Sequence, residues 1–302
     1  MKPTLLVLAA GMGSRYGGLK QMDGLGPHGE TIIDYSIYDA VLAGFGKVVY
    51  IVREYFLEQF RQNVSEKYGN VKCTDGTPLK FEFVTQELDR IPSGFSVNPE
   101  REKPWGTAHA VLMAARTIHE PFAVINGDDF YGRESFRIAA DWCNAHNSTT
   151  GTYAIVGFAL ENTLSENGSV SRGVCEMDAQ GLLLGMTERT AISRTANGIE
   201  YKDADGSMHP LASDATVSMN LFGFTPDYFG ESEKLFVTFL KEKGQEMKSE
   251  YYIPYAVNTF IANGYAKMKV LKTTAQWFGV TYKEDRPSVV ARLKELHDQG
   301  IY

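Results

Sequence analysis

The chain has 302 residues, of which 43% are hydrophobic, 12% aromatic and 22% charged. This is the composition of a globular protein and excludes collagen-like, coiled-coil and disordered classes. The 30 basic and 37 acidic residues give a net charge of −7, which argues against a general binder of nucleic acid or anionic membranes. The length allows one large domain or two small ones.

The first half of the chain alternates strand-like and helix-like segments. Apolar or β-branched runs predict strands at Thr4–Ala9, Lys47–Val52, Lys80–Thr85, Phe122–Asn126 and Gly151–Phe158. Helical spacing of apolar residues predicts helices at Thr31–Gly44, Glu54–Tyr68, Thr107–Ile118 and Arg133–His146. This alternation is typical of a mainly parallel sheet with helices on both faces.

The pattern changes after about residue 160. A hairpin is predicted from Gly173–Asp178 and Leu182–Thr187, and further strands from Thr216–Thr225 and Lys267–Leu271. Helices are predicted at Ser232–Lys243, Tyr251–Asn263 and Ser288–Gln299. Since no linker or repeat separates the halves, we expect one continuous α/β domain whose second half folds over one edge of the first.

Ligands of such sheets bind at the carboxyl ends of the strands. The loops that follow these ends are Ala10–Leu25, Gln86–Gly106 and Gly127–Gly132. The second of them contains the long segment Glu87–Trp105, and a structureless segment of this length is usually functional or disordered. We therefore expect it to act as a lid.

Three cysteines, Cys73, Cys143 and Cys175, lie far apart and form no CxxC pair. This spacing predicts neither a disulfide framework nor a zinc cluster and favours a reducing compartment. The apolar run at residues 4–10 is at the short limit for a signal peptide and is followed at once by a glycine-rich turn. We therefore expect a cytoplasmic protein that does not associate with membranes.

The strongest local motif runs from Leu8 to Lys20, directly after the first strand. Its glycines allow backbone N–H groups to converge on an anion, and Arg15 and Lys20 add charge suited to a polyphosphate. A turn with two solvated cations is the alternative. Neither a dinucleotide fingerprint nor a P-loop fits, because Tyr16 takes the third glycine position and Leu19 precedes the lysine.

This run resembles the signature L-A-A-G-x-G-S/T-R, followed by a lysine, of the sugar-1-phosphate nucleotidyltransferases, the NDP-sugar pyrophosphorylases of the NTP-transferase superfamily. Further motifs follow in the same order at Trp105–Ala110, Asn126–Asp129, Arg172–Glu176, Thr187–Arg189, Ser218–Phe224 and Trp277–Thr281. The resemblance implies a Rossmann-like three-layer α/β fold. It also implies a single domain over 1–302, with a nucleotide-binding half at 1–160 and a sugar-binding half with C-terminal helices at 161–302.

The resemblance further implies transfer of a nucleotidyl group from a nucleoside triphosphate to a sugar 1-phosphate, with Mg²⁺ and release of pyrophosphate. The catalytic residues it implies are Arg15, Lys20 and Asp128. Nucleotide-binding positions are Leu8, Ala9, Ala10, Gly11, Gly13, Ser14, Gln86, Gly106 and Thr107. Acceptor-binding positions are Gly173, Glu188, Arg189 and Asn220. Gln86 could equally be an ordinary loop residue, and Asn220 could be satisfied by neighbouring backbone.

Asp128 is the predicted magnesium ligand, because a carboxylate at the end of a buried strand beside a polyphosphate suits a hard cation. Its alternative role is a helix cap, and Asp129 is expected to point elsewhere. The family commonly has a second aspartate where this chain has Gly279. Asp285, Asp214 or water could replace it.

Two other functions stay open. The spacing between Arg15 and Lys20 is shorter than in many sugar-specific members, so a non-sugar phosphate acceptor is one alternative. A non-catalytic sensor of nucleotide or sugar phosphate is the other, favoured only by Gly279. The sequence does not reveal the base, the sugar or the oligomeric state.

Overall fold

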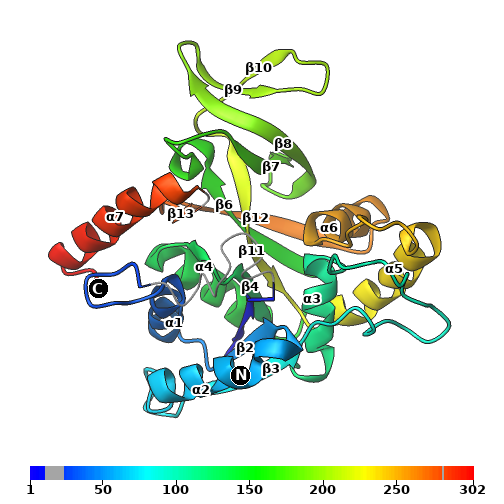
Figure 1. Ribbon diagram of the computed structural model, residues 1–302, viewed down its shortest axis with the longest axis horizontal. Coiled ribbons are helices and arrows are strands. Elements are labelled where there is room, and N and C mark those ends of the chain that lie inside the picture. Colours follow the sequence, from blue (N-terminus) through cyan, green and yellow to red (C-terminus); the bar gives the residue numbers. More distant parts are fainter. Residues whose placement is uncertain (11–23, 281) are drawn as a thin grey trace.

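The computed structural model describes residues 1–10, 24–280 and 282–302 (Figure 1). Its helices are α1 (Ile32–Ala43), α2 (Leu57–Tyr68), α3 (Thr107–Met113), α4 (Arg133–Ala145), α5 (Asp227–Lys243), α6 (Ile253–Ala262) and α7 (Arg286–Asp298). Its strands are β1 (Thr4–Leu8), β2 (Lys47–Val52), β3 (Lys80–Thr85), β4 (Phe122–Asn126), β5 (Asp129–Phe130), β6 (Thr152–Ala159), β7 (Val170–Met177), β8 (Leu183–Thr195), β9 (Gly198–Lys202), β10 (Met208–Leu211), β11 (Thr216–Phe224), β12 (Lys267–Thr273) and β13 (Phe278–Gly279). No helix of these residues is both long and apolar enough to cross a bilayer.

One sheet collects strands from both halves of the chain, in the order β10-β9-β8-β7-β11-β4-β1-β2-β3, with β6 and β12 branching from β11. The strands β4, β1, β2 and β3 run parallel, whereas β11 is antiparallel to β4 and β7. The predicted α/β fold is therefore confirmed. Its parallel part is the first half, and the second half continues the sheet mainly with antiparallel pairs.

Both faces of β1, β2 and β4 are buried, as their apolar runs predict, whereas the edge strand β3 is only partly buried. Leu5 and Val7 of β1 pack with α1, α2 and α4, whereas Leu6 packs with α3, α5 and α6 on the opposite face. The helices thus cover the sheet in two outer layers. Because one strand supplies side chains to both cores, the end of β1 is held rigidly in the middle of the sheet.

A third, smaller core holds α7 beside α1. Val289 and Leu293 of α7 pack with Tyr35 of α1 and with Phe130 of β5. The rings of Phe130 and Phe278 are stacked with their centroids 4.3 Å apart. This packing supports the short β5–β13 ladder next to the end of β4.

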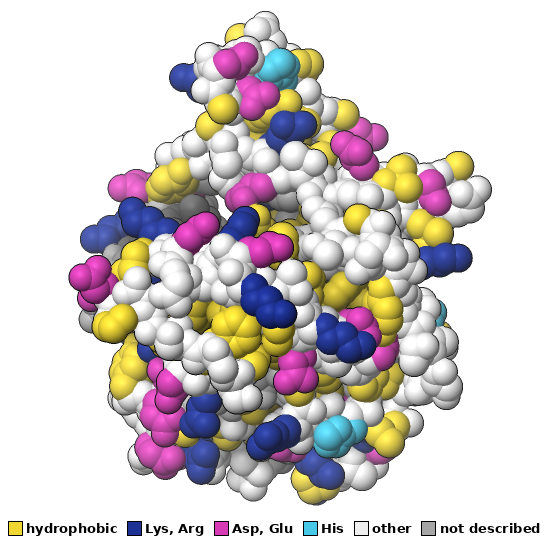
Figure 2. All heavy atoms as spheres, turned by 90° about the vertical axis from the view of Figure 1, so that its right-hand side faces the viewer, with side chains coloured by type: hydrophobic (Ala, Val, Ile, Leu, Met, Phe, Trp, Pro, Cys, Tyr) yellow, Lys and Arg dark blue, Asp and Glu magenta, His cyan; other side chains and the backbone are white. Residues whose placement is uncertain are grey.

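The β7–β8 hairpin was predicted, but its continuation was not. Strand β8 runs to Thr195, and β9 and β10 then form an arm that stands clear of the body at the top of Figures 1 and 2. The arm sequence is short and polar, with Pro210 in β10 and few buried side chains apart from Ile199. Such a segment has little alternating apolar pattern, so periodicity alone does not reveal it.

The loop predicted to be a lid is packed against the protein. The Arg101 guanidinium lies 3.7 Å from the centre of the Trp105 ring and donates to backbone carbonyls of Glu246 and Ser249. The Trp105 indole donates to the carbonyl of Leu88 at 2.9 Å. These contacts anchor both ends of the segment beside α5, and its role as a lid stays a prediction.

Candidate active site

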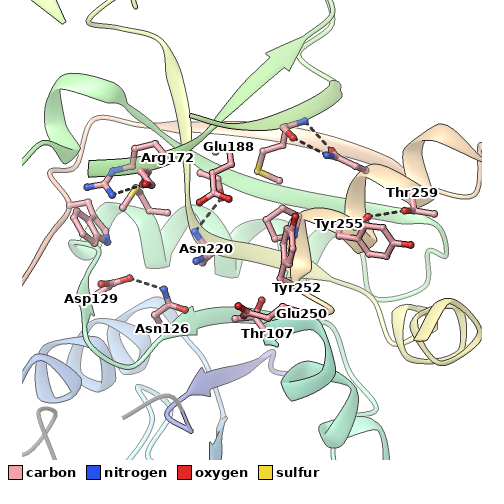
Figure 3. A pocket seen from close by; sticks show the side chains of 18 of the residues that line it. Thr107, Asn126, Asp129, Arg172, Glu188, Asn220, Glu250, Tyr252, Tyr255 and Thr259 are labelled. Carbon is pink, nitrogen blue, oxygen red and sulfur yellow. Dashed lines mark hydrogen bonds between the residues drawn. The ribbon is translucent and has the colours of Figure 1, made fainter. Parts of the chain in front are cut away.

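A cavity of about 810 Å³ opens at the carboxyl end of β4, between the β7–β8 hairpin, β11 and α6 (Figure 3). This is the edge at which α/β sheets bind ligands, and the volume is typical of small-molecule sites. The polar and aromatic residues that line it are Thr107, Asn126, Asp129, Ser171, Arg172, Glu188, Ser218, Asn220, Glu250, Tyr252, Tyr255, Asn258, Thr259 and Trp277.

Asp129 lies at the floor of the cavity in a fixed hydrogen-bond network. The Asn126 amide donates to Asp129 Oδ2 at 2.9 Å, and the Tyr131 hydroxyl lies 3.3 Å from the same oxygen. Burial and the neighbouring Asp129 carboxylate raise the pKa of Tyr131 well above its ordinary value. The sequence favoured Asp128 over Asp129, yet Asp129 is the one that lines the cavity.

Gly279 lies directly opposite Asp129 in the β5–β13 ladder. A Cβ atom at residue 279 would lie 3.1 Å from Asp129 Oδ1. A carboxylate at 279 and the Asp129 carboxylate would therefore compete for the same space. Asp285 does not take the place of a carboxylate at 279. It lies at the start of α7, where it accepts hydrogen bonds from Ser165 and Asn167. Neither Asp285 nor Asp214 lines the cavity.

Asn220 projects into the cavity from an irregular part of β11 (Figure 3). The register of β11 against β6 shifts between Ser218 and Phe222, and Asn220 has a φ of +62°. Asparagine tolerates this left-handed conformation better than most residues, and such irregularities re-aim side chains near functional sites. The apolar strand pattern hides this feature, although the presence of Asn220 within it predicted a special environment.

Glu188 and Arg189 are separated by the alternation of side chains along β8. Glu188 lies opposite Gly173 in the β7–β8 register, and both residues line the cavity. The Arg189 guanidinium instead lies 4.6 Å from the centre of the Tyr201 ring in the arm. The structure thus brings Glu188, Gly173 and Asn220 together, as predicted, and directs Arg189 away from them.

Arg172 is the only basic residue among the described residues that line the cavity. It is 8% exposed, donates to the Thr163 hydroxyl at 3.1 Å and to the Thr163 carbonyl, and stacks 4.8 Å from the centre of the Trp277 ring. Burial lowers its pKa to about 10, although Asp129 acts in the opposite direction. The sequence predicts no role for Arg172, although it begins the motif Arg172–Glu176, and its position next to Gly173 is the one signal that points to it.

The wall made by α6 and the segment before it was also missed. Tyr252, Tyr255 and Glu250 face the cavity, with Glu250 paired to Lys103 (Figure 3). Asn258 holds this wall to the hairpin, because its side chain bonds both the N–H and the carbonyl of Met186, at 3.0 and 2.8 Å. Tyrosine and asparagine residues that line a cavity do not occur at a fixed spacing, so no sequence pattern predicts this wall.

Gln86 and Gly106, both predicted to bind the nucleotide, form a buried network with His109. Gln86 Nε2 donates to the Gly106 carbonyl at 3.0 Å and lies 3.2 Å from His109 Nδ1, while His109 Nε2 donates to the Arg90 carbonyl at 2.8 Å. Gly106 has a φ of +111°, and a Cβ there would lie 2.6 Å from the Tyr251 carbonyl oxygen. Of the three residues predicted here, Thr107 is the one that lines the cavity.

The signature motif begins at the end of β1. Leu8 lies beside Asn126 in the β1–β4 register, and the Gly127 N–H donates to the Leu8 carbonyl at 3.0 Å. Ala9 is buried and Ala10 is half-buried. The predicted residues Gly11, Gly13, Ser14, Arg15 and Lys20 lie outside the described residues.

The sequence profile of the nucleotidyl transferase family matches residues 5–278. The chain belongs to this family. No curated protein sequence matches it. Members of this family are enzymes, and we therefore assign the chain as a nucleotidyltransferase. This assignment agrees with the resemblance seen in its motifs.

Solved structures with the same fold cover nearly the whole chain. They include an inositol-1-phosphate CTP transferase from T. maritima, with 12% identity, 97% of both chains covered and a TM-score of 0.58. A protein from Bacillus anthracis assigned as a glucose-1-phosphate thymidylyltransferase, in complex with sucrose, has 12% identity, 97% and 95% coverage and a TM-score of 0.60. A UDP-glucose pyrophosphorylase complexed with UDP-glucose has 19% identity, 97% and 98% coverage and a TM-score of 0.56.

Proposed function

We propose that this nucleotidyltransferase joins a nucleoside triphosphate to a sugar 1-phosphate and releases pyrophosphate. The observation that carries the proposal is that the end of β1, where the signature motif begins, lies next to the cavity that contains the predicted acceptor positions. The signature motif leaves β1 beside the end of β4, where Asp129 forms the floor of a cavity that also contains Glu188, Gly173 and Asn220. Leu8 and Thr107, two of the positions predicted for the nucleotide, therefore lie at the same sheet edge as the predicted acceptor positions.

The proposed reaction is an in-line displacement at the α-phosphorus. An oxygen of the acceptor phosphate forms the new P–O bond, and the bond from the α-phosphorus to the bridging oxygen of pyrophosphate breaks. The attacking oxygen is already anionic, so the protein needs to position groups and stabilise charge rather than remove a proton. We assign the triphosphate charge to Arg15 and Lys20 and the acceptor hydroxyls to Glu188 and Asn220.

The carboxylates after β4 suit a magnesium ion. Asp128 and Asp129 follow Gly127 at the end of β4 and offer the oxygen ligands that Mg²⁺ prefers. We propose that Asp128 holds the ion and that Asp129, in the space opposite Gly279, replaces the second family carboxylate. When bound, the ion would neutralise charge on the phosphates.

Arg172 is our candidate for the acceptor phosphate, in place of Arg189. A guanidinium has five N–H donors, and the bonds from Arg172 to Thr163 and Ser171 use three of them. Two donors are therefore left for a phosphate in the cavity that Arg172 lines. The stacking on Trp277 and the bonds to Thr163 hold the group in place before substrate arrives.

A non-sugar phosphate acceptor is the second candidate function. Arg189, which the resemblance implies as an acceptor-binding position next to Glu188, lies outside the cavity, so these two neighbours do not face one acceptor together. A polyol phosphate would offer the same hydroxyl and phosphate groups to Glu188, Asn220 and Arg172. We place either reaction in the cytoplasm, a proposal supported by three buried free cysteines.

The deciding experiment measures pyrophosphate release from a grid of nucleoside triphosphates against sugar 1-phosphates and polyol phosphates, with Mg²⁺ and with chelator. We expect metal-dependent release from one combination. Asp129→Asn and Asp128→Asn should each reduce the rate by at least about 10²-fold, because each removes a charge that binds the ion beside the reacting phosphate. Asp178→Asn in the β7–β8 turn serves as the matched control and should retain full activity.

Release with a polyol phosphate alone would select the second candidate. Nucleotide binding without pyrophosphate release across the whole grid would instead support a sensor. Lys20→Ala separates these cases, since an enzyme loses turnover far more than substrate affinity, whereas a sensor loses affinity alone.

A further inference from the structure

Three potential metal ligands meet on the side of the molecule where the C-terminal helix packs. His28 and Glu30 lie in the segment that leads from the signature motif into α1, and His297 lies in the last turn of α7. Figure 1 shows this segment, in dark blue, beside the C-terminal end of the red helix. Residues that are more than 260 positions apart in the chain thus come together.

The geometry of this cluster is compact. One ligand atom from each of His28, Glu30 and His297 lies within 4.8 Å of the other two. The two imidazole rings meet edge to face with centroids 5.6 Å apart. The backbone N–H of His28 donates to Glu30 Oε2 at 2.9 Å and orients this carboxylate.

Two neighbours hold the cluster in place. The Tyr35 hydroxyl lies 3.0 Å from His297 Nε2 and fixes the orientation of the ring. Gly26 leaves room for both groups, because a Cβ there would overlap the Tyr35 hydroxyl and Glu30 Oε2. The N–H groups of Leu25 and Gly26 donate to the Glu30 carbonyl, which closes the segment into a tight loop.

We propose that His28, Glu30 and His297 form a zinc site. Two imidazoles and one carboxylate are a known donor set for Zn²⁺, with the fourth position left to water. Zinc–ligand bonds of about 2.1 Å place tetrahedral donors roughly 3.4 Å apart. Small side-chain rotations of the exposed His28 and of the half-exposed Glu30 and His297 are enough to bring the three ligand atoms to this separation. Imidazole nitrogen favours zinc over magnesium, which separates this site from the carboxylates after β4.

Zinc would tie the exit of the signature motif to α7. Arg286, at the start of α7, already donates to the Gly24 carbonyl at 3.2 Å. The proposed site would add a second attachment at the other end of the same helix. Since the three ligands come together only in the folded chain, zinc would bind the native state preferentially and raise its thermal stability.

The test is a zinc titration of the full-length, chelator-treated protein in excess Mg²⁺, followed by calorimetry. We expect one Zn²⁺ per chain and a rise in melting temperature. His28→Ala and His297→Ala should each weaken zinc binding by at least about 100-fold, and Tyr35→Phe by about 10-fold as the loss of an outer partner. His209→Ala, on the distant arm, is the matched control and should bind zinc like the wild type.

Substitution with Co²⁺ gives a second readout, because a tetrahedral nitrogen–oxygen site produces visible absorption bands that His28→Ala should abolish. His28 is exposed, so that variant tests the site without disturbing a core. Unchanged zinc affinity in both histidine variants, or an equal loss in His209→Ala, would overturn the proposal. The measurement reads zinc binding alone and is independent of the proposed transfer reaction.

Discussion

Single side chains decide which charges reach the cavity. Arg172 and Arg189 lie opposite each other in the β7–β8 register, yet their guanidinium groups end in different places. Thr163 and Trp277 hold Arg172 at the cavity, whereas Tyr201 holds Arg189 in the arm. Because the two residues have the same charge and lie in neighbouring strands, sequence position alone does not distinguish their roles.

Replacing Arg172 by Gln should raise the KM for the phosphate acceptor by about 10- to 100-fold, the effect of losing charged hydrogen bonds. The KM for the nucleotide should change little. Arg189→Gln should leave both constants within about 3-fold, since this side chain stacks on Tyr201 outside the cavity. Steady-state kinetics with each substrate varied in turn measure these constants. A larger acceptor effect in Arg189→Gln than in Arg172→Gln would reverse the assignment.

At the scale of elements, glycines set how closely helices approach the sheet. Gly223 of β11 faces Trp142 of α4, and a Cβ at 223 would lie 2.6 Å from Cε3 of the indole. Gly230 in α5 has no heavy atom within 4 Å of the corresponding position and is exposed. The first glycine is thus required by packing between layers, and the second is not.

Gly223→Val should lower the free energy of unfolding by about 2–3 kcal/mol, because the added atoms overpack the interface between β11 and α4. Gly230→Ala should raise it by about 0.5–1 kcal/mol, because alanine loses less backbone entropy in a helix. Urea unfolding of both variants at neutral pH measures the difference. Equal stability of the two variants would contradict this account of the layer packing.

At the scale of the whole molecule, two buried groups give stability opposite dependences on pH. Burial lowers the pKa of His109 from 6.5 to about 4. Between the two pKa values the unfolded chain therefore binds more protons than the folded chain. The free energy of unfolding consequently rises by about 3 kcal/mol as the pH rises through this range. Burial raises the pKa of Asp39 from 3.8 to about 6. Between these two pKa values the native chain binds more protons than the unfolded chain. The free energy of unfolding therefore falls by about 3 kcal/mol as the pH rises through this range.

Because these contributions nearly cancel between pH 4 and 6, removing either group should expose the other. Relative to the wild type, Asp39→Asn should gain about 3 kcal/mol more stability from pH 4 to pH 6.5, and His109→Gln should lose a similar amount. Urea unfolding at several pH values measures these slopes, which are informative even if a variant is less stable throughout. Parallel profiles for all three proteins would show that neither group titrates as described.

The sequence alone determined the parallel half of the fold and the order of the motifs. The strands Lys47–Val52, Lys80–Thr85 and Phe122–Asn126 have the predicted bounds, because apolar or β-branched runs in the first and third, and alternating aromatic residues in the second, leave little choice of structure. The motifs also placed Glu188, Gly173, Asn220 and Thr107, all of which line the cavity. Local pattern suffices where a residue's environment follows from its own strand or turn.

Only the tertiary structure decided which neighbours these residues meet. Asp129 faces Gly279 through a ladder between strands of two residues each, and Arg172 depends on Trp277, about a hundred positions away. The arm of β9 and β10 and the meeting of His28 with His297 likewise depend on long-range packing. Such contacts have no local periodicity, because the free energy that fixes them comes from burial between distant segments rather than from the conformational preference of either one.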